Sequence, residues 1–115
     1  MHLPQEAMLL RIFIGENDRH GPRPLYEAIV LAARERGLAG ATVIRGPMGY
    51  GASSRLHTAK ILRLSEDLPL VIEIVDSEER IRGFLPVLET MMRASGLVTL
   101  EKVQVIRYGT ETGGR

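Results

Sequence analysis

Two segments of this chain have apolar residues on both faces of a strand, and this pattern constrains the fold more than any other feature. Residues 7–14 read AMLLRIFI and residues 70–75 read LVIEIV, each interrupted by a single charged residue, Arg11 or Glu73. A strand with one face in water alternates apolar and polar residues, whereas a strand covered on both sides stays apolar throughout. Both segments therefore predict a sheet that needs cover on its two faces.

Two other segments carry the apolar spacing of helices. The first spans residues 25–36 and places one apolar stripe opposite a polar face. Pro24 suits its first turn, and Gly37 suits a left-handed helix end. Leu31 falls on the polar face, which makes it a candidate for contact with another subunit.

The second helix is expected to follow Asp76, which we assign as the N-cap of a capping box closed by Glu79. Gly83 and Pro86 lie inside this segment, so we expect a bend or a missing hydrogen bond there. Gly96 is expected to end the helix. The predicted buried positions of this helix are Ile81, Phe84, Leu85, Leu88 and Met92.

These elements follow one another in the order β-α-β-β-α-β. That order is the split βαβ arrangement, so we predict an α+β, ferredoxin-like fold with a four-stranded antiparallel sheet. A chain of 115 residues suits one domain, 1–115, with a core of about 7–108 and a flexible tail at 109–115. The predicted strands are 7–14, 41–45, 70–75 and 98–108, with a further extended segment at 58–64.

Two helices cover only one face of such a sheet, so the other face needs a partner. Another copy of the chain is the simplest cover, and a closed ring satisfies every copy. Arg11 and Glu73 lie on strands that are central neighbours in this fold. We expect them to pair on the face towards the other subunit, because an unpaired charge there is costly. The alternative is that one or both reach solvent at a subunit edge.

Charge and composition exclude several functional classes. Fifteen basic residues against fourteen acidic leave a net charge of +1, which argues against a protein dedicated to duplex nucleic acid. The absence of cysteine excludes disulfides and thiolate metal sites. No signal peptide is recognisable, and no apolar run reaches the roughly 18 residues of a membrane span. We therefore expect a soluble, cytoplasmic protein without membrane insertion.

Residues 45–60, RGPMGYGASSRLHTAK, are rich in glycine and basic residues. The spacing of Gly46 and Gly51 opens a Walker phosphate loop, but the required lysine and hydroxyl residue do not follow. The pair Gly49 and Gly51 similarly lacks the last glycine of a dinucleotide fingerprint, and no helix is predicted to follow. What remains is a loop beside Arg45 whose backbone N–H groups suit an anion. A flexible hairpin extension is the alternative.

Several other polar positions are candidates for a site. His57 could titrate near neutral pH or bind a phosphate, or it is an ordinary surface histidine. Glu16 and Asp18 lie in a polar loop that could reach a ligand, or only form a solvated turn. Arg107 and Tyr108 end the last predicted strand, where a guanidinium and an aromatic ring suit a phosphate and a base. The alternative for that pair is a position at the surface of the sheet edge.

Four longer runs carry a resemblance to a known family. They read LRIFIGENDRHGPRPLYEAIV, GLAGATVIRGPMGYG, LHTAKILRLSEDLPLVIEIVD and GLVTLEKVQVIRY, and they cover about residues 7–108. The chain resembles the PII-like family known as domain of unknown function 190. This resemblance implies a ferredoxin-like protomer in a PII-like homotrimer. It also implies adenine-nucleotide sites in clefts between subunits and a long loop, here residues 46–60, that meets partner proteins.

One junction departs from true PII proteins, whose glycine-rich phosphate loop lies before the last strand and ends in a lysine. Residues 94–99 here read ASGLVT, with one glycine and no lysine before Lys102. This difference favours a mononucleotide or diphosphate over a triphosphate, held partly by residues 46–51. The family's uridylylated tyrosine pattern is also absent, so Tyr50 is not expected to be a modification site.

Together these features predict a non-enzymatic regulatory protein that binds an adenine nucleotide of the AMP or ADP class between subunits. It would need no cofactor and would switch the 46–60 loop to control a membrane transporter or an enzyme. One alternative is a cation-binding trimer similar to the divalent-cation tolerance proteins, weakened by the lack of cysteine and of a histidine cluster. Another is a small nucleotide hydrolase using His57 with Glu16 or Asp18. The residues expected to bind the nucleotide are Arg45, Gly46, Gly49, Tyr50, Gly51, His57, Arg107 and Tyr108; no metal ligand or catalytic residue is expected.

Overall fold

The structure, a computed structural model, describes residues 3–49, 57–58, 67–93 and 95–109. Its centre is a four-stranded sheet in the order β4-β7-β1-β8, and every neighbouring pair is antiparallel. The predicted α+β class and four-stranded antiparallel sheet are therefore confirmed. The four strands are β1 (Glu6–Gly15), β4 (Thr42–Arg45), β7 (Pro69–Asp76) and β8 (Leu97–Gln104).

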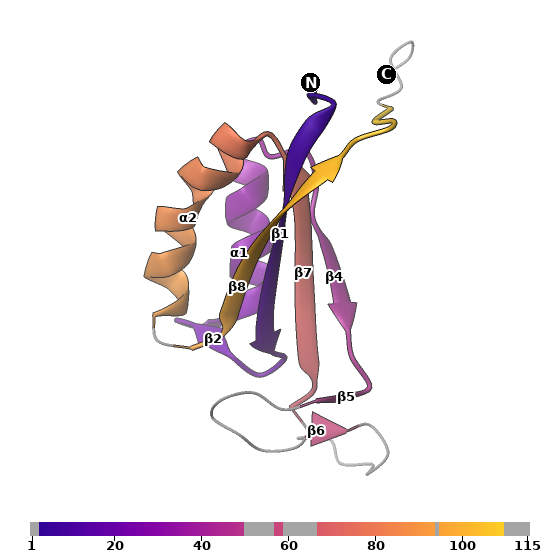
Figure 1. The fold of residues 1–115 in the computed structure, drawn as a ribbon. Helices are drawn as coiled ribbons and strands as arrows, with labels where there is room; N and C mark the ends of the chain where they lie inside the picture. The colour runs from indigo at the N-terminus through magenta and orange to yellow at the C-terminus, as the bar shows by residue number, and fades with distance from the viewer. Residues whose placement is uncertain (1–2, 50–56, 59–66, 94, 110–115) are drawn as a thin grey trace.

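Two helices lie on the same face of this sheet, as Figure 1 shows. Two short ladders complete the described structure. One precedes the first helix, and the other lies beyond the end of the sheet where β4 stops. The helices are α1 (Leu25–Glu35) and α2 (Glu78–Met92), and the ladders pair β2 (Arg19–His20) with β3 (Arg23–Pro24) and β5 (Met48–Gly49) with β6 (His57–Thr58).

The core lies between the helices and the sheet. Alternate side chains of a strand point to opposite faces, so every second residue of β1 and β7 meets the helices. Those positions are aliphatic, and each such side chain contributes about 1.5–3 kcal/mol when fully buried. The largest of the fully buried apolar side chains are Leu10, Ile12, Leu25, Ile29, Ile72, Ile74, Ile81, Phe84 and Leu88.

The opposite face of the sheet is covered by none of the described elements, and we call it the open sheet face. Arg11 and Glu73 are direct cross-strand partners on it, and Arg11 Nε donates to Glu73 Oε2 at 2.9 Å. The predicted Arg11–Glu73 pair is therefore confirmed. Arg11 also reaches Glu101 Oε1 at 3.2 Å. Strand parity and register assign to this face Ala7, Leu9, Arg11, Phe13, Thr42, Ile44, Val71, Glu73, Val75, Leu97, Thr99, Glu101 and Val103.

The start of α2 differs from the expected capping box. Ser77, not Asp76, is the N-cap, and its hydroxyl accepts from the Arg80 backbone N–H at 3.2 Å. Asp76 is the last residue of β7 and is only 1% exposed. The assignment of Asp76 was wrong because its carboxylate bonds to the segment that leads into β4, which no local pattern reveals.

The ends of α2 and β8 also differ from expectation. The helix continues through Gly83 and Pro86 but stops at Met92, four residues before Gly96. Gly96 instead has φ +89° in the turn into β8, where a Cβ would lie 3.0 Å from the Phe13 carbonyl oxygen. The strand β8 ends at Gln104 and not at residue 108, because its ladder partner β1 begins at Glu6.

Some expectations fall largely outside the described residues. Of the predicted extended segment at 58–64, only Thr58 is described, and it belongs to β6. Of the predicted tail, only Gly109 is described. The expected bend in α2 stays a prediction. Within the described ranges, α1 and α2 are too short or too polar to cross a membrane.

Candidate ligand-binding site

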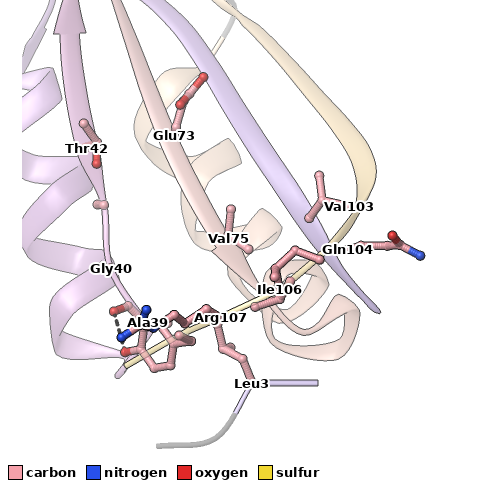
Figure 2. A pocket seen from close by; sticks show the side chains of 13 residues that line it. Leu3, Ala39, Gly40, Thr42, Glu73, Val75, Val103, Gln104, Ile106 and Arg107 are labelled. Atoms are coloured by element: carbon pink, nitrogen blue, oxygen red, sulfur yellow. Dashed lines mark hydrogen bonds between the residues drawn. The ribbon is translucent and has the colours of Figure 1, made fainter. Parts of the chain in front are cut away.

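A pocket of about 580 Å³ lies at the end of the open sheet face where β7 finishes. Figure 2 shows Glu73 and Val75 following one another along β7 towards Ile106 and Arg107. The volume of this pocket falls within the range of about 300–1,000 Å³ that is typical of small-molecule sites. The pocket is lined by Leu3, residues 39–42, Glu73, Val75 and residues 103–108.

Two irregular segments build the walls of this pocket. One is the link between α1 and β4, and the other is the chain that continues past the end of β8. They are joined by the Tyr108 hydroxyl, which donates to the carbonyl oxygen of Ala39 at 3.1 Å. The chain past β8 is also held at its start, where the Val105 backbone N–H donates to the Gln5 carbonyl at 2.6 Å. Tyr108 is therefore fixed at the pocket by contacts distant in sequence.

Asp76 supports the pocket wall from behind. Its Oδ2 accepts from the Ala39 backbone N–H at 2.9 Å and from Arg80 Nε at 3.2 Å. Its Oδ1 accepts from the Ser77 backbone N–H at 2.7 Å. Arg80 also donates to the carbonyl oxygen of Gly37. Sequence reasoning missed this role, because an acid directly after the apolar run LVIEIV is equally typical of a helix N-cap.

The pocket holds two charged side chains of opposite sign. Glu73 is engaged by Arg11, and the hydrogen bond between them, reinforced by the charges of Glu73 and Glu101, raises the pKa of the Arg11 guanidinium. Arg107 pairs with no acidic side chain in the described part of the chain, so its guanidinium is available to an anion. A pocket with one available cation suits a ligand of modest negative charge.

The other predicted site residues lie at the opposite end of β7. The Gly46 backbone N–H donates to the Pro69 carbonyl at 2.8 Å, which ties the chain after β4 to the start of β7. A Cβ placed on Gly46 or Gly49 would lie 3.1 Å from Pro69 Cγ. Arg45 is paired with Glu16, with 2.5 Å between Nη2 and Oε2. This end therefore holds a close-packed turn beside an ion pair.

Glu16 and Asp18 have structural contacts at this end. The Glu16 backbone N–H donates to the Leu68 carbonyl at 2.8 Å, and the Asp18 carboxylate accepts from the Gly15 backbone N–H at 3.0 Å. The backbone of His57 pairs with Gly49 in the β5–β6 ladder. The site residues Tyr50 and Gly51 lie outside the described residues.

One chain does not bring the predicted site residues together. Gly46 and Gly49 adjoin Pro69, the first residue of β7. Tyr108 instead contacts Ala39, which is hydrogen-bonded to Asp76, the last residue of β7. The eight residues of β7 make seven steps, and at about 3.3 Å per step the two ends are roughly 23 Å apart. Figure 1 shows β5 and the chain after β8 at opposite ends of the sheet.

The described residues contain no cluster of three or more histidine, aspartate or glutamate side chains placed to hold a metal ion. The residues near the pocket are instead a guanidinium, a phenol and backbone groups. These groups can bind phosphate, ribose and an aromatic base.

Comparisons with known proteins agree with this fold. The family model described as "DUF190: Uncharacterized ACR, COG1993" matches residues 7–105. A UPF0166 protein of Aquifex aeolicus (strain VF5) is 44% identical over 98 residues, which cover 85% of this chain and 91% of that protein. A UPF0166 protein of Methanocaldococcus jannaschii is 34% identical over 105 residues, covering 91% and 96% of the two chains.

A solved structure has the same fold at lower identity. It is CPII from Thiomonas intermedia K12, a nitrogen regulatory PII-like protein bound to ADP, AMP and bicarbonate. Its TM-score is 0.60 at 22% sequence identity, and the match covers 89% of this chain and 90% of that one. The two helices on one face of a four-stranded antiparallel sheet are thus a PII-like fold. With the family model matched over most of its length, the chain belongs to the DUF190 family.

Proposed function

We propose that this protein is a non-enzymatic, PII-like regulatory protein that binds an adenine nucleotide of the AMP or ADP class between the subunits of a homotrimer. The observation that carries this proposal is the pocket beside the open sheet face, in which Arg107 is available and Tyr108 is held by Ala39. The fold of CPII, a protein solved with ADP and AMP, supports the same ligand class.

The separation of the predicted site residues supports a site made by two copies. Gly46 and Gly49 adjoin one end of β7 and the Arg107–Tyr108 segment lies at the other, roughly 23 Å away, which is too far for one nucleotide to touch both. The pocket borders the open sheet face, which a second copy would cover. In this proposal the glycine-rich segment of one subunit completes the pocket of its neighbour.

The pocket chemistry indicates how a nucleotide would lie. Arg107 would bind the phosphate through charge-assisted hydrogen bonds, and the ring of Tyr108 would stack on the base. Among the described lining residues Arg107 is the one cation, and Glu73 is already paired with Arg11, so the pocket favours a mono- or diphosphate over a triphosphate. Backbone groups of the 39–42 segment offer further partners for the base or the ribose.

The neighbouring subunit would supply the remaining contacts. Close approach of the Gly46–Gly49 backbone and the Arg45 guanidinium would complete the phosphate site, with Tyr50, Gly51 and His57 as further proposed contacts. Arg45 has five N–H donors, so it can bind a phosphate while it keeps one bond to Glu16. Binding at this junction would change residues 46–60, and that change would control a partner protein, a membrane transporter or an enzyme.

Calorimetry with AMP, ADP, ATP and cyclic AMP tests the ligand class. We expect AMP or ADP to bind, and Arg107→Gln to weaken binding by about tenfold or more because it removes the charged phosphate contact. Arg82→Gln is the matched control, since Arg82 pairs with Glu78 on the outer side of α2. The absence of heat with every nucleotide at millimolar concentration would overturn the proposal.

The same samples test the assembly and the two alternatives. Light scattering coupled to gel filtration should give the mass of a trimer, and a monomer at all concentrations would contradict the shared site. Release of a nucleotide product, abolished by His57→Ala, would favour the hydrolase. Retention of copper or zinc in equilibrium dialysis would favour the cation-binding trimer.

A further inference from the structure

We propose that Asp76 is the positioning residue of the pocket: its buried carboxylate holds residues 37–40 in the arrangement that forms one wall. This inference rests on the proposed function for its ligand. It concerns a residue that would touch no nucleotide, since Asp76 is 1% exposed and does not line the pocket. The inference adds to the proposed site a group that acts through the Ala39 backbone.

The first argument is that both oxygens of the Asp76 carboxylate are hydrogen-bonded. It accepts three hydrogen bonds, from the backbone N–H groups of Ala39 and Ser77 and from Arg80 Nε. Burying a carboxylate is costly unless such donors compensate it. A carboxylate with this many fixed partners holds those partners in place in turn.

The second argument is that residues 39–40 have little packing of their own, whereas Leu38 packs against the core and its N–H, like that of Gly37, donates to the end of α1. Gly37 has φ +75°, and Gly40 has no atom within 4 Å of the position of a Cβ. The segment is held at both ends by the same cluster, because Arg80 donates to the Gly37 carbonyl and Asp76 accepts from the Ala39 N–H. The buried cluster thus compensates for weak side-chain packing in the segment.

The third argument is that Ala39 connects this cluster to the pocket. Its N–H points to Asp76, while its carbonyl accepts from the Tyr108 hydroxyl at 3.1 Å. Loss of the first bond frees the peptide unit before Ala39, and the next peptide unit, which shares the Ala39 Cα and carries the acceptor of Tyr108, then moves as well. A ring that stacks on a base must be held in one orientation, so Asp76 sets the affinity of the pocket indirectly.

Asp76→Asn is the decisive variant because the side chain keeps its shape but loses its charge and one acceptor atom. We expect the Ala39 amide to exchange with solvent at least tenfold faster in NMR hydrogen exchange, while amides in the centre of β1 and β7 stay protected. We expect affinity for AMP or ADP to fall by about tenfold, as the loss of a buried hydrogen bond to a charged group implies. Arg82→Gln should change neither measurement.

Arg80 provides a second pair of variants if Asp76→Asn does not fold. Arg80→Met removes the bonds to Asp76 and Gly37 from a half-exposed side chain, and should speed Ala39 exchange and weaken binding several-fold. Arg80→Lys keeps the positive charge beside Asp76 and should restore part of the Ala39 protection and part of the nucleotide affinity. If Arg80 only stabilised the fold, Arg80→Met and Arg80→Lys variants of equal melting temperature would show the same Ala39 exchange and the same nucleotide affinity.

The results separate this inference from the proposed function. A folded Asp76→Asn variant with a protected Ala39 amide and nucleotide affinity within twofold of the parent overturns the positioning role. A parent protein that binds no adenine nucleotide overturns the proposed function. In that case, Ala39 exchange in the Asp76 and Arg80 variants decides the positioning role alone.

Discussion

The two faces of the sheet are made by the same strands but have different surroundings. On the face under the helices, Ile12 and Ile72 have no exposed surface. On the open sheet face, Phe13, beside Ile12, is 36% exposed, and the Arg11–Glu73 pair is partly exposed. Burial under the helices stabilises the single chain. The open face combines exposed apolar side chains with the Arg11–Glu73 pair, and in the proposed assembly another copy covers it.

Ile72→Ala is the largest expected effect. Removing three carbons from a fully buried side chain loses transfer free energy and leaves a cavity, so the free energy of unfolding should fall by about 2–5 kcal/mol. Urea unfolding followed by circular dichroism measures this change. A loss below about 1 kcal/mol would mean that the covered face is not the main source of stability.

Val71→Ala is the matched variant on the other face, one residue earlier in the same strand. In the separate chain, Val71→Ala should lower the free energy of unfolding by less, about 1 kcal/mol, because Val71 is only half-buried. If another copy covers this face, the same substitution should weaken assembly and make the oligomer dissociate at higher protein concentration. Sedimentation equilibrium distinguishes the two effects. Unchanged assembly together with a large loss of chain stability would reverse the proposed roles of the two faces.

Arg11→Met removes the cation that two carboxylates share on the open face. In the separate chain these groups are a third or more exposed, so solvent screening keeps the loss of stability small. In an assembly that buries Glu73, the unpaired carboxylate should strongly oppose association. We therefore expect little change in monomer melting and a clear shift to smaller species in light scattering. An oligomer with unaltered mass and melting would show that water still reaches Glu73 in the assembly.

Glu78→Gln should have the smallest effect, because the Glu78–Arg82 pair is exposed on the helix side of the molecule. The hydrogen bond and charge of Arg82 hold the pKa of Glu78 below its ordinary value of 4.5. The pair therefore stabilises the fold above that value, and its contribution disappears as the pH falls through the lowered pKa. The melting temperature should fall slightly less from about pH 5 to pH 3 in the variant than in the parent. An equal slope would mean that this pair contributes nothing measurable.

Sequence periodicity predicted much of the fold. Arg11 and Glu73 mark one face of β1 and β7, and the buried side chains on the other face are apolar up to Asp76. The Arg11–Glu73 pair followed because the two charges interrupt apolar faces of strands that are neighbours in this fold. These features depend on local alternation and on one well-known order of elements, and both are readable in a linear chain.

The candidate site was predictable only in part. Arg107 and Tyr108 were identified as candidates, but they lie beyond the end of β8 and not within it. Their distance from Gly46 was not evident, because a residue list does not say which end of a strand each loop reaches. Asp76 was assigned to the wrong role, since one of its partners is a backbone N–H 37 residues away. Backbone groups are the same at every residue, so no sequence pattern marks such a partner.

The sequence by itself determined the order of the elements, the aliphatic face that meets the helices and the charge pair on the opposite face. These follow from side-chain hydrophobicity and spacing, which are local properties. Only the tertiary structure decided that the glycine-rich turn and the Arg107–Tyr108 segment occupy opposite ends of β7, and that Asp76 supports the pocket wall. The physical reason is that both depend on where the chain ends meet across the sheet and on hydrogen bonds to backbone atoms, which every residue type supplies alike.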